Sequence, residues 1–351
     1  MRIKDIAKLA NVSTSAVSLA LNGKPGVSED TREKILKITN EYGYTPRSSI
    51  KTVPKGKVLR FVAGVNYGLV TEKYDSLPFF VELIHYINEN ISSKGYSLLI
   101  SSLNSENLVS ELSLLEQDQP TNGIILLGTN LKSEQIQSIS ENHPNVVVID
   151  TCFETLNIDF VVMNNVMGAF EAGTYLIEQG HTKVAYAQSN TRMYNFEKRK
   201  EGFFQAMKTA EISIPASNIY TLSPTEVSSQ DIFKLGISND LTNLPTVIFC
   251  ECDYIAISVI KSLAELGINV PEDISVIGFD NIWEAQIINP ELTTVHVKKD
   301  RIASIAVEKV IQNISNPENE RIKMLVDTKI IERSSCQKIN DVYNLGELTV
   351  N

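Results

Sequence analysis

The apolar residues in the first 43 positions have the spacing of short helices. From residue 3 to residue 10 they recur at i, i+3, i+4 and i+7, which predicts one amphipathic helix. Residues 11–13 interrupt this pattern, and Ser13 is suited to cap a second helix, whose apolar face holds Val17, Ala20 and Leu21. A third helix is predicted from Ser28 to near Gly43. Two short helices joined by a three-residue turn and braced by a third predict a helix-turn-helix domain.

From Leu59 onward the pattern changes to short apolar runs that alternate with helix-like stretches. The runs are continuous rather than alternating, which is typical of parallel strands covered on both faces. They lie at residues 61–65, 98–101, 124–127, 146–149, 184–187, 247–250 and 276–279. Seven strands are more than a single sheet of ordinary size holds. The pattern therefore predicts an α/β body of two doubly wound parallel-sheet lobes. Ligands bind such sheets at the carboxyl ends of the strands.

The charges divide the chain at the same place. The first 60 residues hold twelve Lys and Arg against five Asp and Glu, a balance of +7, so the remaining 291 residues sum to −17. A basic helical head on an acidic body indicates a protein that holds a polyanion at one end and senses something at the other. The length of 351 residues allows two or three domains.

Composition also predicts the compartment. Residues 1–11 are polar and helix-patterned, unlike a secretory signal, and no apolar run reaches the length of about 18 residues that a membrane span needs. The four cysteines are sparse for a disulfide framework in so long a chain. We therefore expect a cytoplasmic protein without a membrane partner.

No motif in the sequence supports catalysis, a cofactor or a metal. The Gly-rich dinucleotide and P-loop motifs, the nucleophile elbow and the zinc-protease motif are all missing from the sequence. His181, in a Gly-His turn, is interpreted as structural. Cys250 and Cys252 lie on one side of a strand, but two thiols without nearby partners make a weak metal site and are interpreted as buried small side chains. The expectation is a protein that is not an enzyme.

Four blocks of the head form a recognisable pattern: Ile3-Lys4-Asp5-Ile6-Ala7-Lys8-Leu9-Ala10-Asn11-Val12-Ser13, Ala16-Val17-Ser18, Leu21-Asn22-Gly23 and Val27-Ser28-Glu29-Asp30-Thr31-Arg32. They closely resemble the N-terminal headpiece of the LacI/GalR family of bacterial repressors. This resemblance implies that the head binds double-stranded operator DNA. The alternative is a capped three-helix domain that makes no contact with DNA.

The resemblance also implies which head residues contact DNA. The second helix would enter the major groove with Thr14, Ser15 and Leu19 nearest the base edges. Many relatives carry Arg at the Leu19 position, whereas Leu offers only apolar contact, for example to a thymine methyl group. Backbone phosphates would be held by Ser13, Ser18, Asn22, Ser28 and Thr31, although each of these could equally be only a helix cap.

The hinge segment departs from the family pattern. Relatives usually carry a segment that folds into a short helix on DNA and wedges a Leu into the minor groove. Here Val53 takes the wedge position, and Pro54 disfavours the helical conformation at Val53. Two interpretations stay open: either the segment folds with Val53 as a smaller wedge, or it stays extended and contacts phosphates through Arg47, Lys51, Lys55 and Lys57.

Further blocks lie in the body: Leu77-Pro78-Phe79-Phe80, Gly95-Tyr96, Gly180-His181, Arg199 with Gly202-Phe203, Asp253 with Ala256, residues 267–280 and residues 292–295. They resemble the family's effector-binding core, which is related to periplasmic sugar-binding proteins and crosses three times between lobes. Those crossings are expected near residues 163, 289 and 322. The predicted domains are a headpiece at 1–46, a hinge at 47–58, an N-lobe at 59–163 with 290–321, a C-lobe at 164–289 with 322–336, and a tail at 337–351.

The resemblance places a small-molecule effector, expected to be a carbohydrate or a derivative, in the cleft between the lobes. Asp150 and Asp280 would accept hydrogen bonds from ligand hydroxyls, and Arg199 would donate to ligand oxygens. The alternative for these three is hydrogen bonding between the lobes. Phe79 or Phe80 would offer an apolar face. Trp283 would stack on a sugar ring, its alternative being a place in a packed lobe surface.

Three departures weaken the expectation of a sugar. Cys252 stands in the site where relatives usually carry Asn or Asp, and a thiol bonds poorly to hydroxyls. Leu127 occupies a strand end that is polar in some sugar binders. Residues 66–76 resemble an insertion that reshapes the cleft rim. A less polar pocket indicates either an unusual ligand or a regulator that has lost its small-molecule response.

Members of the family dimerise through the body and read a pseudo-palindromic operator with two headpieces. The resemblance therefore implies a homodimeric transcriptional regulator, expected to be a repressor whose DNA affinity a small molecule modulates. The tail contains no leucine heptads, so no tetramerising coiled coil is expected. The alternatives are a regulator controlled by a protein partner or without a small-molecule response, and a cytoplasmic solute-binding protein.

Overall fold

The computed structural model describes residues 3–21, 26–41, 56–65, 69–71, 73–239 and 242–339. The chain forms two compact units, residues 1–57 and residues 58–351, which correspond to the predicted head with its hinge and to the predicted body. Of the residues expected to contact DNA, Asn22 and Val53 lie outside the described residues, as does most of the expected hinge.

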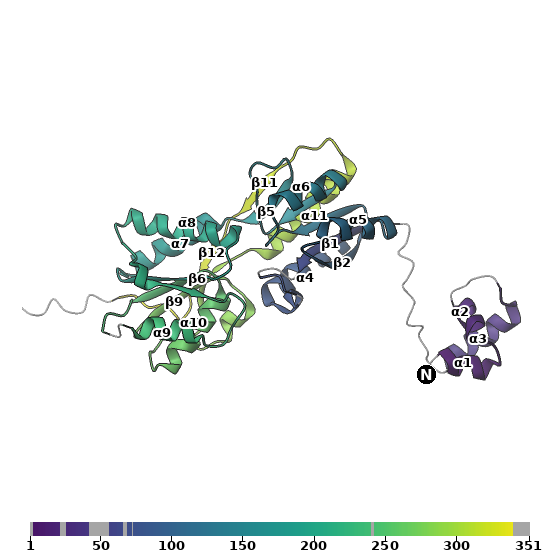
Figure 1. Ribbon diagram of the computed structural model, residues 1–351, viewed down its shortest axis with the longest axis horizontal. Coiled ribbons are helices and arrows are strands. Elements are labelled where there is room, and N and C mark those ends of the chain that lie inside the picture. The colour runs from purple at the N-terminus through teal and green to yellow at the C-terminus, as the bar shows by residue number, and fades with distance from the viewer. Residues whose placement is uncertain are drawn as a thin grey trace, which may run out of the picture. The chain divides into compact units, whose positions relative to one another are not determined.

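The first unit contains three helices, α1 (Ile3–Ala10), α2 (Thr14–Leu21) and α3 (Glu29–Glu41), which appear in purple in Figure 1. Each helix contacts the other two. Their shared core is small and consists of six buried side chains, Ile6, Ala7, Ala10, Val17, Ala20 and Ile35. The 3.6-residue periodicity of the sequence therefore predicted the first two helices and the residues that they bury, whereas the third helix was predicted from its start at Ser28 without a buried face.

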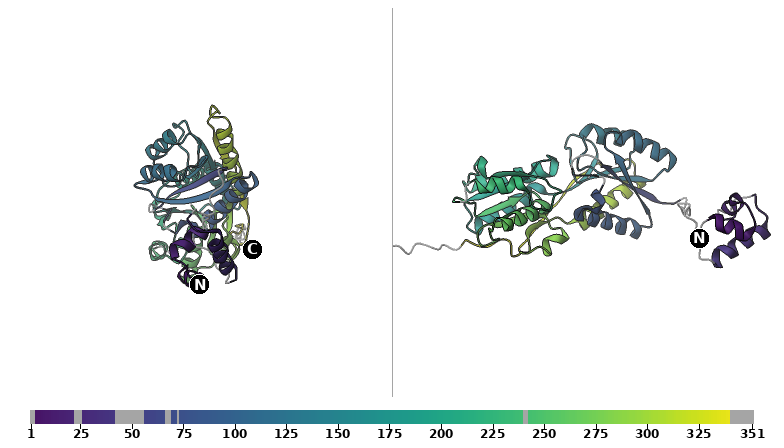
Figure 2. Two further views of the ribbon diagram at one scale, coloured as in Figure 1. Left: turned by 90° about the vertical axis from the view of Figure 1, so that its right-hand side faces the viewer. Right: turned by 60° about the horizontal axis from the view of Figure 1, so that its bottom comes forward.

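The first lobe of the body is built on a six-stranded parallel sheet in the order β11-β5-β4-β3-β1-β2. Its strands are β1 (Val58–Val65), β2 (Ser97–Asn104), β3 (Gly123–Leu127), β4 (Val146–Ile149), β5 (Asp159–Met163) and β11 (Lys323–Val326). A short helix, η1 (Tyr74–Ser76), precedes its first long helix. Four helices belong to this lobe, α4 (Pro78–Ser93), α5 (Leu108–Asp118), α6 (Ser133–Asn142) and α11 (Lys299–Ser315). Helices α4 and α11 pack together, as do α5 and α6, so each pair covers one face of the sheet (Figure 2).

The second lobe has a six-stranded sheet in the order β12-β10-β9-β8-β6-β7, in which only the edge strand β12 is antiparallel to its neighbour. Its strands are β6 (Val184–Ser189), β7 (Ile219–Leu222), β8 (Val247–Cys250), β9 (Ser275–Asp280), β10 (Thr293–His296) and β12 (Lys329–Ile331). Its helices are α7 (Asn165–Glu178), α8 (Tyr194–Thr209), α9 (Asp231–Ser238) and α10 (Asp253–Glu265), with short helices η2 (Ala216–Asn218) and η3 (Trp283–Gln286). Figure 1 shows α7 and α8 on one face of this sheet and α9 and α10 on the other.

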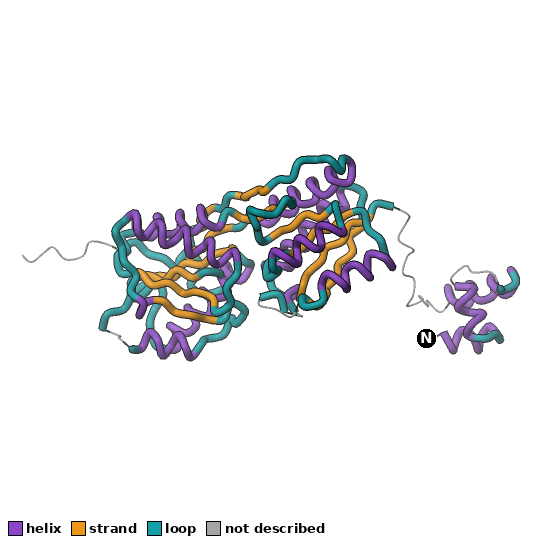
Figure 3. The backbone as a smooth tube through the Cα atoms, turned by 45° about the horizontal axis from the view of Figure 1, so that its top comes forward, coloured by secondary structure: helices purple, strands orange, loops and turns teal. Residues whose placement is uncertain are grey.

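The chain passes between the two sheets three times, through connections that Figure 3 shows in teal. These passages lie between β5 and α7, between β10 and α11, and between β11 and β12. Two expected boundaries are therefore wrong: the boundary near 289 precedes β10, which belongs to the second sheet, and the boundary near 322 precedes β11, which belongs to the first. Both strands are short and border a change of lobe, so no long apolar run marks them in the sequence.

Candidate effector cleft and DNA-binding surface

The two sheets direct their carboxyl ends to a common cleft, as doubly wound folds do. Six of the seven residues predicted to bind an effector line one narrow cavity there, namely Phe79, Phe80, Asp150, Arg199, Cys252 and Asp280. Five further residues complete the lining: Leu69, Met193, Asn195, Phe196 and Tyr254. The first lobe contributes α4 and the residue after β4, and the second lobe contributes α8, the start of α10 and the end of β9.

Trp283 does not line this cavity. It begins the short helix η3 and is 62% exposed. It therefore lies on the surface of the second lobe, without the packing that the alternative interpretation expected. Leu127, the other strand-end residue considered, is buried in the first lobe and also lies outside the lining.

The two acidic residues occupy backbone conformations that suit the ends of strands. Asp150 has φ 65° and Asp280 has φ 117°, both in the region of positive φ that non-glycine residues seldom adopt. Such conformations persist where the surrounding structure holds them, and they turn the side chain from the sheet into the cleft. Both carboxylates are buried.

A chain of hydrogen bonds connects these carboxylates across the lobes. Asn195 donates to Asp150 Oδ1 at 2.8 Å and accepts from Asn165 Nδ2 at 2.9 Å. Arg199 Nε donates to Asn165 Oδ1 at 3.0 Å. Arg199 NH2 then donates to Asp280 Oδ1 at 2.8 Å. The predicted alternative of hydrogen bonding between lobes is therefore present in this conformation, because Asp150 belongs to the first lobe and the other four to the second.

Asn165 and Asn195 were not predicted from the sequence, because both are ordinary polar residues near helix starts. Asn195 and Arg199 are four residues apart on α8, a spacing that places both on one helix face. This spacing from the predicted Arg199 could have indicated that Asn195 also faces the cleft. Thr129 was missed as well; its hydroxyl donates to Asp150 Oδ2 at 2.5 Å.

Arg199 is held in place from several sides. Its NH1 group donates to the Glu251 backbone oxygen at 2.6 Å, and its guanidinium lies 3.9 Å from the centre of the Phe279 ring. With the bonds from Nε to Asn165 and from NH2 to Asp280, Arg199 uses three of its five N–H groups. The close approach of α8 to α7 depends on Gly202, since a Cβ there would overlap the Val166 backbone oxygen.

Burial controls the ionisation of the cleft acids. Desolvation raises the pKa of Asp150 to about 6, although hydrogen bonds from Thr129 and Asn195 oppose the change. Desolvation also raises the pKa of Asp253 to about 7, and the nearby Asp280 carboxylate adds to that effect. The pKa of Asp280 itself is raised by burial despite the pairing with Arg199. Burial raises the pKa of the Cys252 thiol, so this side chain enters the site as a neutral, weakly polar group.

Two further contacts join the lobes at the cleft. The Phe79 backbone N–H donates to the Tyr254 hydroxyl at 3.1 Å. Lys299, which is buried, lies 3.0 Å from the Glu82 carboxylate of the first lobe and donates to the Asp280 backbone oxygen of the second at 3.2 Å. The cavity that remains has a volume of only about 20 Å³, which is room for a single water molecule.

The stretch at residues 66–76 reaches the cleft through Leu69, which lines the cavity. Tyr74 is buried, and its hydroxyl lies 3.3 Å from the Ser102 hydroxyl.

His181, Cys250 and Cys252 are also buried, and His181 bonds Thr246 and the Gln337 backbone. Within the described residues, no group of three potential metal ligands occurs, and no helix has the length and apolar character to cross a membrane.

The described residues among those predicted to contact DNA lie just before α2, on α2 and at the start of α3. Thr14 and Ser15 are exposed, and Ser13 accepts from the Ala16 backbone N–H at 3.1 Å, as an N-cap does. Leu19 is half-buried, with its side chain near Gly26. Ser18 and Thr31 are half-buried, whereas Ser28 is exposed and its hydroxyl lies 2.8 Å from that of Thr31.

Comparison with known proteins identifies both units. Residues 2–47 match the family described as bacterial regulatory proteins, lacI family, and residues 174–336 match the periplasmic binding protein-like domain. The chain is 31% identical over 338 residues to the probable HTH-type transcriptional repressor ExuR of Bacillus subtilis (strain 168), an alignment that covers 96% of this chain and 98% of the relative. It is 30% identical over 340 residues to the ribose operon repressor of Haemophilus influenzae, covering 95% and 98%.

Solved structures share the fold. A putative LacI transcriptional regulator from Bacillus cereus subsp. cytotoxis NVH 391-98 has a TM-score of 0.71 at 26% identity, covering 81% of this chain and 99% of that one. The transcriptional regulator CelR in complex with cellobiose has a TM-score of 0.68 at 20% identity, covering 95% and 99%. The lac repressor dimer bound to operator and the anti-inducer ONPF has a TM-score of 0.68 at 20% identity, covering 96% and 99%.

Proposed function

The chain belongs to the LacI family of bacterial regulatory proteins and is a DNA-binding transcriptional regulator; we propose that it is a repressor that binds a pseudo-palindromic operator as a homodimer. A small hydroxyl-rich molecule in the cleft between the lobes changes its operator affinity. The observation that carries the effector site is the convergence of Asp150, Arg199 and Asp280 with Phe79 and Phe80 on one cavity. Because it acts on the chromosome, the regulator works in the cytoplasm.

The headpiece reads DNA with α2. Thr14, Ser15 and Leu19 face base edges in the major groove, and the hydroxyls of Ser13, Ser18, Ser28 and Thr31 hold phosphates and fix the register. Leu19 makes only apolar contact, so this position favours a thymine methyl group over guanine. The outward exposure of Thr14 and Ser15 supports this role.

The cleft suits a neutral ligand with hydroxyls along one edge. Asp150 and Asp280 accept from hydroxyls, and the two N–H groups of Arg199 that remain available donate to a ligand oxygen. The aromatic side chains Phe79, Phe80 and Phe196 cover the apolar face of a sugar ring. That this fold can hold sugars is supported by the solved complexes with cellobiose and with ribose.

Effector binding requires the lobes to separate. A cavity of about 20 Å³ is far smaller than a sugar, and ligand pockets typically measure about 300–1,000 Å³. The hydrogen bonds from Asn195 to Asp150 and from Phe79 to Tyr254, together with the ion pair of Lys299 and Glu82, must then be exchanged for contacts with the ligand. The ligand therefore selects a different angle between the lobes.

The dimer forms through an apolar surface that both lobes share. A cavity of about 390 Å³ near the start of α4 is lined by Leu77 and Pro78 of the first lobe and by Val227, Tyr254, Ile257, Ile287 and Ile288 of the second. Val227 is 41% exposed, and Ile287 and the neighbouring Trp283 are more than 60% exposed. A second copy that covers this surface removes these side chains from water. Since both lobes build it, a change in lobe angle alters the dimer and hence the spacing of the two headpieces.

This coupling is reciprocal. An effector that changes operator affinity by a given factor requires that operator DNA change effector affinity by the same factor. Operator DNA that leaves effector affinity unaltered would contradict the scheme.

The test is an unbiased selection of genomic fragments bound by the purified full-length protein at a stated salt concentration, because DNA affinity depends steeply on salt. A recovered pseudo-palindrome supports a dimeric sequence-specific regulator, and the neighbouring genes nominate effectors for a screen of operator release. Sequence-blind, salt-sensitive binding alone would overturn the proposed reading of the headpiece. A pseudo-palindrome that no small molecule releases would favour the alternative of a regulator without a small-molecule response, which the Cys252 position supports.

A further inference from the structure

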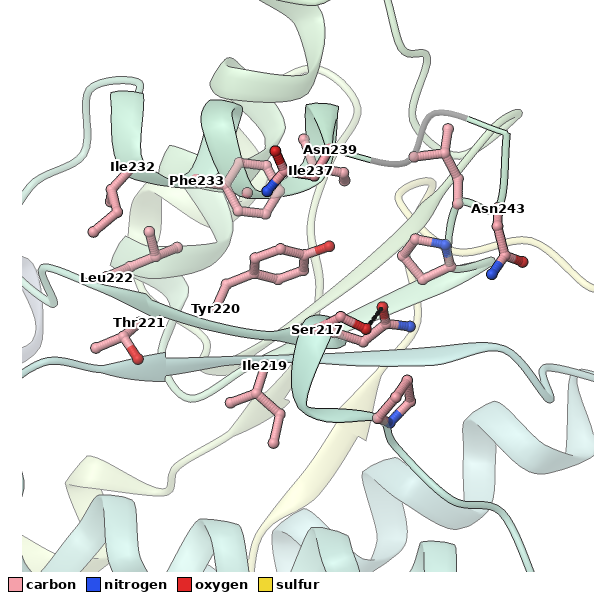
Figure 4. A pocket seen from close by; sticks show the side chains of 15 residues that line it. Ser217, Ile219, Tyr220, Thr221, Leu222, Ile232, Phe233, Ile237, Asn239 and Asn243 are labelled. Carbon is pink, nitrogen blue, oxygen red and sulfur yellow. Dashed lines mark hydrogen bonds between the residues drawn. The ribbon is translucent and has the colours of Figure 1, made fainter.

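A second cavity, of about 350 Å³, lies in the second lobe between β7 and α9 (Figure 4). Its lining includes six consecutive residues, 217–222, of which the last four form β7. Side chains of consecutive strand residues point to opposite faces of a sheet. In Figure 4, Tyr220 and Leu222 point toward α9, whereas Ile219 points the other way. A cavity that touches residues of both faces runs along the edge of the strand, so this one is a groove beside the β7 backbone.

The edge along this groove is unpaired in the part of the chain that the structure describes. Strand β7 pairs with β6 on one side and ends the sheet on the other. The opposite wall is apolar and comes from α9, through Ile232, Phe233 and Ile237. Ile232 is 65% exposed. A free strand edge beside an apolar wall is the geometry that accepts an added strand, whose backbone pairs with the edge while alternate side chains fill the groove.

The last described residue lies beside this sheet. The Ile339 backbone N–H donates to the Gln179 backbone oxygen at 2.8 Å, and a Cβ on Gly180 would touch Ile339 at 3.3 Å. This is the turn that leads into β6, the strand next to β7. On the same end of the sheet, Lys183 Nζ donates to Asn243 Oδ1 at 3.0 Å, and Asn243 lines the groove. Ile339 therefore contacts the turn before β6, the strand that pairs with β7.

Twelve residues follow Ile339 in the sequence, and an extended chain of that length spans up to about 40 Å. Residues 347–351, Glu-Leu-Thr-Val-Asn, alternate polar and apolar positions with the period of a strand, and both Thr and Val favour strands. They also follow the end of the match to the periplasmic binding protein-like domain at residue 336. This segment is thus an addition to the domain, patterned as a strand and within reach of the groove.

We propose that residues 347–351 bind within the same molecule along the free edge of β7 as an added strand. Leu348 and Val350 then fill the groove beside α9, and Thr349 points to the opposite face. The added strand closes an edge that would otherwise be open to pairing with another molecule. The interaction is separate from the effector cleft and does not depend on the proposed function.

The test is amide hydrogen exchange of residues 219–222, compared between the full-length protein and a chain that ends at residue 339. We expect these amides to exchange at least about tenfold more slowly in the full-length protein, with the amides of β8 unchanged. Protection should not depend on protein concentration. Adding a synthetic peptide of residues 340–351 to the shortened chain should restore it.

Substitutions on both sides of the contact have matched controls. Leu348→Asp should remove the protection, whereas Thr349→Asp should keep it. Ile232→Asp should remove it, whereas Leu235→Asp should keep it, since Leu235 is 71% exposed on the same helix but does not line the groove. Equal exchange with and without the tail would overturn the proposal, as would protection that survives Leu348→Asp. Protection that appears only at high protein concentration would assign the groove to the tail of a second molecule and overturn binding within one chain.

Discussion

The headpiece surface and the effector cleft differ in how their residues are brought together. The described DNA-contacting candidates lie within 19 consecutive positions, from Ser13 to Thr31, and several face solvent. The cleft residues come from segments as far apart as Phe79 and Asp280, and most are buried and bonded to one another. A change in the headpiece therefore alters binding with little effect on folding. A change in the cleft alters binding and stability together, because each polar side chain there is also hydrogen-bonded to another polar side chain of the cleft.

The largest effect should come from the packing that positions the cleft. Gly202→Ala places a methyl group against the Val166 backbone oxygen, which cannot move without separating α7 from α8. We expect a loss of more than about 4 kcal/mol in the free energy of unfolding of the body, measured by denaturant titration. Lys208→Ala, at an exposed position of the same helix, should change it by less than about 0.5 kcal/mol.

The next effect tests whether stability and binding can be separated in the cleft. Arg199→Met leaves the Asp280 carboxylate buried without its partner, at a cost of about 3–5 kcal/mol in unfolding free energy. The double variant Arg199→Met with Asp280→Asn should recover much of that stability but not the effector response. Operator release by an identified effector is the readout. A double variant that responds like the wild type would remove Arg199 from the proposed binding site.

The buried acids should make body stability dependent on pH. Asp150 and Asp253 bind their protons more tightly in the folded state, with pKa values of about 6 and about 7, than in the unfolded chain. Their contribution to stability is complete below the unfolded pKa and is lost as pH rises through these values. The unfolding free energy should fall as pH rises from about 4, the pKa of Asp in an unfolded chain, to about 7, by up to about 1.4 kcal/mol per pH unit for each such proton. Asp253→Asn should flatten this slope; an unchanged slope would mean that Asp253 does not titrate in this range.

A substitution in the proposed dimer surface should affect neither the headpiece nor the effector cleft. Trp283→Ala removes an exposed apolar side chain near the proposed interface and should weaken dimerisation by about 2 kcal/mol, as measured by sedimentation equilibrium. The control is Leu114→Ala, 66% exposed on α5. Equal dimer affinity in the two variants would mean that the dimer interface does not include the surface around Trp283.

The smallest effect on folding is expected in the headpiece. Leu19→Arg should shift preference at one operator position toward guanine by about 1–3 kcal/mol and leave the body's unfolding free energy unchanged. Repeating the fragment selection with the variant measures this shift. Ser18→Ala should weaken binding to all sequences alike, and an unchanged base preference for Leu19→Arg would mean that Leu19 does not face the groove.

Much of the fold could be predicted where the sequence carries a local period. The first two head helices follow from apolar spacing and the third from its N-terminal signals, and all seven apolar runs lie in strands of the two sheets. Strands β7, β10, β11 and β12 were missed because polar residues interrupt or begin each of them, so none contains a continuous apolar run of four residues. Strand β5 was missed although residues 160–163 form an apolar run. Such short runs resemble turns or helix ends, and only pairing with a neighbour makes them strands.

The candidate cleft was predicted only in part. Asp150 and Asp280 stand at strand ends, which marks them in the sequence, whereas Asn165 and Asn195 gain their place only from the packing of α7 against α8. Trp283 follows Asp280 by three residues, yet the turn after β9 directs it to the surface.

By itself, the sequence determined the helical head, the α/β body and the family, because periodicity, charge and motif spacing are local properties. Only the tertiary structure decided that Asp150 bonds Asn195 across the lobes, that the cleft is closed around Arg199, and that β7 presents a free edge. Each of these depends on distances between segments far apart in the chain, which packing sets and which no local pattern contains.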